Sequence, residues 1–106
     1  MDNISNELNN LLNNNQKRQI EINDIFMSLP KGHVNTLYRN NKGYYYLTYR
    51  DGKKINNDYL GPVGKTDLGE IISKLNERGK LKKELSELKK EEKKLKKLIN
   101  KANDVS

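Results

Sequence analysis

The C-terminal part of the chain carries a regular heptad of apolar residues, which constrains the fold more than any other feature. Its positions, three and four residues apart, are Leu81, Leu85, Leu88, Glu92, Leu95 and Ile99. A second seam with the same spacing runs through the N-terminal region: Ile4, Leu8, Leu11, Asn15, Arg18, Ile22, Ile25 and Leu29. Such spacing predicts two helices that each bury one narrow stripe. We expect a helix over 2–29, ended by Pro30, and a second over 66–101.

The second helix has a weak point at Gly79. The stretch NERGK at 76–80 interrupts the apolar pattern, which slips there by one residue, and a helical Gly costs about 1 kcal/mol relative to Ala. We therefore expect either one helix kinked near Gly79 or two helices. Asp67, with Glu70 three residues later, fits a capping arrangement at its start. Residues 102–106 are expected to form a disordered tail.

The two seams match when they are laid antiparallel. In this register Asn15 lies opposite Glu92, and Arg18 lies opposite Leu88 within reach of Glu92. Polar residues at seam positions commonly fix register at a cost in stability. We therefore expect an antiparallel coiled coil within the chain. Pairing of the same seams between two chains is the alternative.

Residues 32–60 have the composition of strands. The runs GHVNTLYR, YYYLTYR and KKINNDYL are rich in β-branched and aromatic residues. They are separated by NNKG and by the pair Asp51-Gly52, for which we expect a type I′ turn. The pattern predicts a three-stranded antiparallel meander and, with the helices, an α+β fold in one domain over 1–106. Counting back from the second turn pairs Arg50 with Lys53 and Tyr44 with Tyr59.

The predicted meander has two different faces. Tyr45, Leu47 and Tyr49 share the face that we expect to pack on the helix starting at Leu68. The outward face then carries Arg39, Tyr44, Tyr46, Arg50 and Lys53. A bulge would invert this assignment, because a one-residue slip moves every side chain to the other face.

Positive charge is concentrated in the meander. The chain has a formal net charge of +7, and residues 25–54 contain six basic residues against one acid. Cations on a sheet neutralise phosphates, and tyrosines stack on bases or bond the backbone. The alternative is that the tyrosines supply the apolar material of the sheet. The predicted nucleic-acid-binding residues are Arg39, Lys42, Tyr44, Tyr46, Arg50, Lys53, Lys65 and Thr66.

The stretch YLGPVGKT at 59–66 contains the last three positions of the phosphate-loop pattern G-x-x-x-x-G-K-[ST]. Tyr59 stands where the first glycine is needed, and the preceding strand belongs to an antiparallel meander, so we do not expect a nucleotide loop. We interpret Gly64, Lys65 and Thr66 as a turn near a helix N-terminus. It would either cap the helix or contact one backbone phosphate.

No catalytic, metal-binding or cofactor-binding site is expected. The chain has no cysteine and one histidine, and His33 lacks the companions of a metal site or a catalytic triad. No long apolar run or signal sequence occurs, so we expect a cytoplasmic protein without a membrane partner. The lysines of residues 65–106, mixed with acids, are expected to form a solvated coiled-coil surface.

Two resemblances follow from these motifs. The run LPKGHVNTLYRNNKGYYYLTYRDGKKINNDYLG at 29–61, followed by a basic heptad helix, resembles small prokaryotic proteins of uncharacterised function, which implies no activity. More distantly, the order of three strands, Asp-Gly-Lys turn and amphipathic helix is similar to the arm-type DNA-binding domain of tyrosine recombinases. That resemblance implies that Tyr44, Tyr46, Arg50 and Lys53 face DNA. A coiled-coil helix, and no recombinase catalytic domain, follows the meander here.

The sequence therefore predicts a non-enzymatic protein that binds DNA or RNA through a basic, Tyr-rich sheet. One alternative is a phage or mobile-element inhibitor or adaptor of the anti-CRISPR kind, which binds a nucleic-acid-handling host protein. Another is a coiled-coil dimerisation module.

Overall fold

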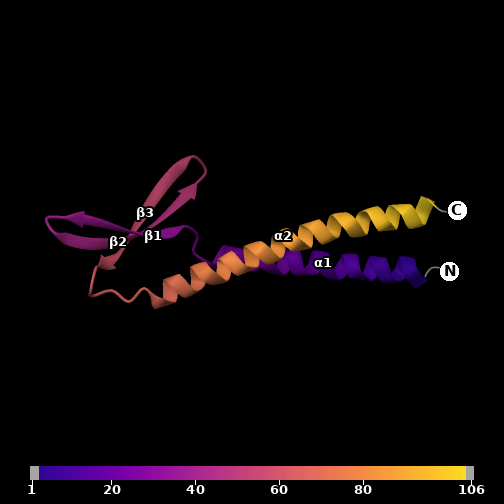
Figure 1. Ribbon diagram of the computed structural model, residues 1–106, viewed down its shortest axis with the longest axis horizontal. Coiled ribbons are helices and arrows are strands. Elements are labelled where there is room, and N and C mark those ends of the chain that lie inside the picture. The colour runs from indigo at the N-terminus through magenta and orange to yellow at the C-terminus, as the bar shows by residue number, and fades with distance from the viewer. Residues whose placement is uncertain (1–2, 105–106) are drawn as a thin grey trace. The chain divides into compact units, whose positions relative to one another are not determined.

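A computed structural model describes residues 3–104 of the chain as two helices and three strands (Figure 1). In chain order these are α1 (Asn3–Ser28), β1 (His33–Arg39), β2 (Lys42–Asp51), β3 (Lys54–Pro62) and α2 (Gly69–Asp104). The predicted α+β order of helix, three-stranded antiparallel sheet and long helix is confirmed. Contacts divide the chain into two compact units, the helical Met1–Ser28 with Lys80–Ser106, and the sheet-containing Leu29–Gly79.

The helical unit is an antiparallel hairpin of α1 with the second part of α2 (Figure 1). Ile22 is fully buried, and Asn15 is only 3% exposed. The apolar side chains that α2 buries in this unit are Leu81, Leu85 and Leu95. The Asn15 side-chain amide donates to the carbonyl oxygen of Leu88 (2.8 Å) and to Oε1 of Glu91 (3.0 Å). The predicted antiparallel pairing of the two helices is confirmed. Asn15 lies at the turn of α2 that precedes Glu92, the residue predicted to lie opposite it.

The contact face of α1 is rotated relative to the predicted seam. Leu11 is 47% exposed and Ile4 is 71% exposed, whereas Leu12, Gln19 and Phe26 are half-buried. Leu12, Gln19 and Phe26 therefore replace Leu11, Arg18 and Ile25 in the seam. Leu8, Asn15 and Ile22 keep their places, and the heptad spacing is the same.

This rotation corrects the predicted partner of Arg18. Arg18 does not reach Glu92, because it lies at the flank of the seam rather than in its centre. Its Nε donates to Oε2 of Glu84 (2.6 Å) and its Nη2 to Oε1 of the same carboxylate (3.0 Å). Glu92 instead accepts a hydrogen bond from Nε2 of Gln16 (3.1 Å).

Helix α2 is continuous through Gly79, so the alternative of two separate helices is wrong. It begins at Gly69, whose amide donates to Oδ1 of Asp67 (2.8 Å). Asp67 therefore caps the helix through the amide two residues later, not through Glu70. Helix α2 also extends to Asp104, beyond the predicted end at 101, and the rest of the predicted tail lies outside the described residues.

The type I′ turn lies in the first hairpin and not in the second, where it was predicted. Asn40 and Asn41 both have positive φ (51° and 65°), the pattern of a type I′ turn. In the second turn Asp51 pairs with Lys54, and Gly52 is the one loop residue with positive φ (63°), as in a type II′ turn. The expected type I′ turn at Asp51-Gly52 is therefore wrong.

The shifted turn changes the register but not the faces of β2. Arg50 pairs with Ile55 instead of Lys53, and Tyr46 pairs with Tyr59. The predicted register is thus displaced by two residues, which preserves the alternation of side chains. A bulge does occur, but it follows Tyr59 and leaves the face assignment of β2 unchanged. Leu47, on the face predicted to be covered, is 7% exposed.

Candidate nucleic-acid interface

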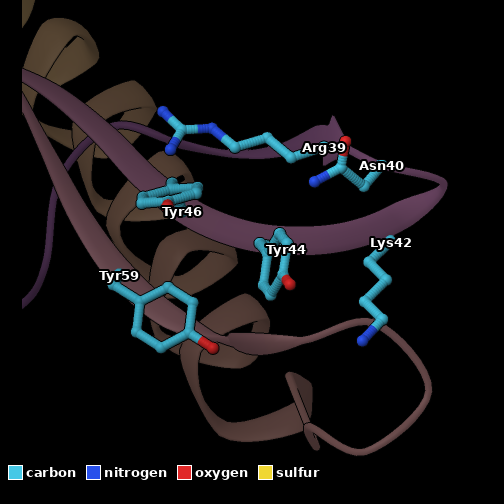
Figure 2. A pocket seen from close by; sticks show the side chains of 6 residues that line it. All are labelled: Arg39, Asn40, Lys42, Tyr44, Tyr46 and Tyr59. Carbon is cyan, nitrogen blue, oxygen red and sulfur yellow. The ribbon is translucent and has the colours of Figure 1, made fainter.

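One face of the sheet carries an open hollow of about 510 Å³ (Figure 2). Its lining residues are Arg39, Asn40, Lys42, Tyr44, Tyr46 and Tyr59. Figure 2 shows the three tyrosine rings grouped on this face, with the Arg39 and Lys42 side chains at its margin. Among the described residues, no acidic side chain lines the hollow.

The β1–β2 hairpin places two basic residues at paired positions of the sheet. Because the loop has only two residues, Arg39 and Lys42 form the closing pair of the hairpin and lie directly opposite each other. Like charges directly opposite each other do not stabilise a strand pair. Figure 2 shows their side chains extending to different sides of the tyrosine rings, so both charges border the hollow and favour binding of a negatively charged partner there.

Tyr59 joins two rings of β2 into one cluster. Its ring centroid lies 5.5 Å from that of Tyr46 and 6.3 Å from that of Tyr44, and both pairs are tilted. Tyr46 is its direct cross-strand partner, and the bulge begins immediately after Tyr59. Tyr59 remains 57% exposed, whereas Tyr44 and Tyr46 are half-buried. The two half-buried rings thus support one exposed ring.

A row of polar side chains crosses all three strands beside the tyrosine cluster. Nδ2 of Asn35 donates to the Thr48 hydroxyl (2.7 Å), which donates to Oδ1 of Asn57 (2.7 Å). Arg50 lies beyond this row, about 13 Å along the strand from Tyr46 at the usual rise per residue. Lys53 lies in the β2–β3 turn. The structure therefore does not bring these two predicted residues into the hollow.

A second hollow, of about 540 Å³, shares Lys42 and Tyr44 with the first and is also lined by Lys65. The amide of Val63 donates to the carbonyl oxygen of Gly43 (2.9 Å), which holds the segment after β3 against β2. Three of the basic residues predicted to bind nucleic acid thus line two adjoining hollows: Arg39, Lys42 and Lys65.

Thr66 serves the turn before α2. Its hydroxyl donates to the carbonyl oxygen of Pro62 (2.8 Å), as does the amide of Lys65 (3.3 Å). Helix α2 begins three residues after Thr66, and the Asp67 carboxylate already accepts the hydrogen of its first amide. Of the two interpretations of this stretch, the geometry favours turn formation and capping over a phosphate contact.

The acids near the sheet lie elsewhere. Asp58 pairs with Leu47 on the opposite face. The negative charge of Asp58, together with burial and a hydrogen bond to Asp58, raises the pKa of the Tyr49 phenol above its ordinary value. The face with the hollow is therefore the more positive of the two.

Tyr59 and Asn40 line the hollow but are not among the nucleic-acid-binding residues predicted from the sequence. Strand alternation already placed Tyr59 on the outward face. The predicted register, however, paired Tyr59 with Tyr44 and not with Tyr46, its partner in the structure. Asn40 enters the hollow through the type I′ turn, which the Asn-Asn pair also supports because Asn tolerates positive φ.

Comparison of the chain with protein-family models, curated proteins and solved structures gave no match. The described residues contain no group of three or more His, Asp or Glu side chains that could hold a metal ion. Neither helix, over its described length, is apolar enough to cross a membrane.

Proposed function

We propose that this protein binds nucleic acid, DNA or RNA, through the basic and Tyr-rich face of its sheet, without catalysis, and that it does so in the cytoplasm. The observation that carries the proposal is the direct opposition of Arg39 and Lys42 beside an exposed tyrosine, with no acid among the described residues lining the hollow. Phosphate contacts from Lys and Arg supply most of the affinity of such interfaces.

The residues of the hollow divide into two roles. Arg39 and Lys42 neutralise backbone phosphates, and Lys65 extends the positive surface along the second hollow. Tyr59 offers its ring to a base, while Tyr44 and Tyr46 hold that ring in place. Stacking of one base on an aromatic side chain contributes roughly 1–3 kcal/mol. The sheet thereby contacts the backbone and one base together.

The test is the salt dependence of binding by fluorescence anisotropy with labelled DNA and RNA oligonucleotides. Removing two phosphate contacts in Arg39→Gln/Lys42→Gln lowers the slope of log K against log salt by about 1.4–1.8. The matched control, Lys17→Gln/Lys80→Gln, removes the same charge from exposed helical positions. It leaves the slope nearly unchanged.

The proposal is wrong if the unmodified protein binds neither nucleic acid at low salt, or if the two variants have equal slopes. If the unmodified protein binds no nucleic acid at low salt, the alternative function is favoured, in which the chain is an inhibitor or adaptor that binds another protein.

A further inference from the structure

The outer surface of α2 separates its charges by sign. Segment 82–97 contains eight lysines and four glutamates. At about 100° per residue, the eight lysines fall within an arc of about 160° of the helix circumference. Ser86 is the one other residue of the segment in that arc, and all eight lysines are exposed. We call this surface the lysine ridge.

Three of the four glutamates of the segment are held by hydrogen bonds from α1. Glu84 binds the Arg18 guanidinium, and Glu91 accepts from the Asn15 amide (3.0 Å). Glu92 accepts from Gln16 (3.1 Å), and this bond is the main cause that lowers the pKa of its carboxyl. Three of the four acids are therefore engaged by the partner helix, and the fourth, Glu87, is exposed about 20° beyond the edge of the arc.

Little of the ridge's charge is neutralised internally. Among the described side chains, the ion pair that involves a ridge lysine is Lys96 with Glu92, at 3.8 Å. Exposed pairs at this helical spacing are weak, so Lys96 is easily released. The ridge thus presents a concentrated positive charge to any polyanion.

The dimensions of the ridge fit a rigid polyanion. Sixteen residues of helix extend over about 22 Å. Duplex DNA carries one negative charge per about 1.7 Å of axis, so about 13 phosphates lie along that length. The arc contains no aromatic side chain for base stacking and no apolar side chain for insertion between lipids. These properties favour the backbone of a duplex over single strands or a membrane surface.

We propose that the lysine ridge is a second nucleic-acid-binding surface, which holds the phosphate backbone of a duplex without reading its sequence. It lies on the helical unit, uses none of the residues of the sheet hollow, and does not depend on the function proposed for that hollow. Its contribution is electrostatic and falls steeply with salt.

The experiment compares full-length variants on a labelled 24-base-pair duplex over a range of salt concentrations. Lys83→Gln/Lys90→Gln/Lys97→Gln neutralises one row along the ridge, and Gln has nearly the helix propensity of Lys. The matched control is Lys17→Gln/Lys74→Gln/Lys80→Gln, three exposed lysines outside the ridge. Helical content by circular dichroism verifies that both variants fold.

The ridge variant lowers the salt slope by about 2–3 relative to the control, since each lost phosphate contact removes about 0.9. Equal slopes for the two variants overturn the proposal. It is also overturned if the ridge variant loses binding to phosphatidylserine vesicles and retains duplex binding. The Arg39→Gln/Lys42→Gln variant distinguishes binding by the sheet from binding by the ridge. Each variant lowers only the part of the salt slope that its own surface contributes.

Discussion

Arg18 of the helical unit and Arg39 of the sheet unit have neighbours of opposite charge. In the helical unit Arg18 meets the Glu84 carboxylate through two hydrogen bonds. In the sheet unit Arg39 faces Lys42 across the strand pair. The first arrangement satisfies a charge within the fold and fixes how two helices meet. The second places two basic residues at paired positions, with their charged ends on different sides of the tyrosine rings (Figure 2), which makes the sheet the better candidate for a partner that brings negative charge.

The largest effect that tests this comparison concerns the stability of the helical unit. Ile22→Ala removes a fully buried side chain and lowers the free energy of unfolding by about 2–5 kcal/mol. Ile20→Ala is the matched control, since Ile20 is 62% exposed on the same helix. Urea denaturation followed by circular dichroism measures both. A similar loss in the two variants would contradict the helical pairing described above.

A smaller effect is expected on the sheet. Tyr59→Ala removes the exposed ring of the hollow and weakens binding of a single-stranded oligonucleotide by roughly 1–3 kcal/mol. The control is Tyr49→Ala, because Tyr49 lies on the opposite face of the sheet and lines neither hollow. Anisotropy titrations at constant salt compare the two. If Tyr59→Ala binds as well as the control, the tyrosines are structural material of the sheet and not a stacking surface.

The smallest effect is the acid sensitivity of the helical unit. The hydrogen bond from Arg18 lowers the pKa of the Glu84 carboxyl below its ordinary value of 4.5, and the bond from Gln16 does the same for Glu92. A carboxyl with a lowered folded pKa stabilises the fold above its ordinary pKa, and this contribution is lost as the pH falls through the lower value. We therefore expect the melting temperature to decrease as the pH is taken below 4.5.

Glu84→Gln tests the origin of this acid sensitivity. The variant removes a carboxyl with a lowered pKa, so its melting temperature changes less between neutral and acidic pH than that of the unmodified chain. An equal change in both proteins would show that Glu84 is not responsible.

The sequence predicted the order of elements because its periodicities are unambiguous at that scale. It could not choose the seam of α1, where Leu11 is followed by Leu12 and Ile25 by Phe26. The predicted seam and the observed seam are therefore both apolar at positions 11–12 and 25–26. Placing Arg18 at the flank, where it reaches Glu84, selects the second seam.

The sheet shows the same limit at its turns. Two-residue loops at Asp51-Gly52 and at Gly52-Lys53 are both compatible with a glycine of positive φ. The two loop positions give registers of β2 against β3 that differ by two residues. The same side chains face outward in either register. The faces were therefore predictable, whereas the partner of Tyr59 and the outline of the hollow were not.

The most direct test of the central claim is a titration of isotope-labelled protein with a short single-stranded oligonucleotide, followed through the backbone amide resonances. If the opposed cations of the sheet bind the backbone, the largest shifts occur between Arg39 and Tyr46 and around Tyr59, and they disappear in Arg39→Gln/Lys42→Gln. Shifts that spare these segments, or that persist in the variant, would contradict the account.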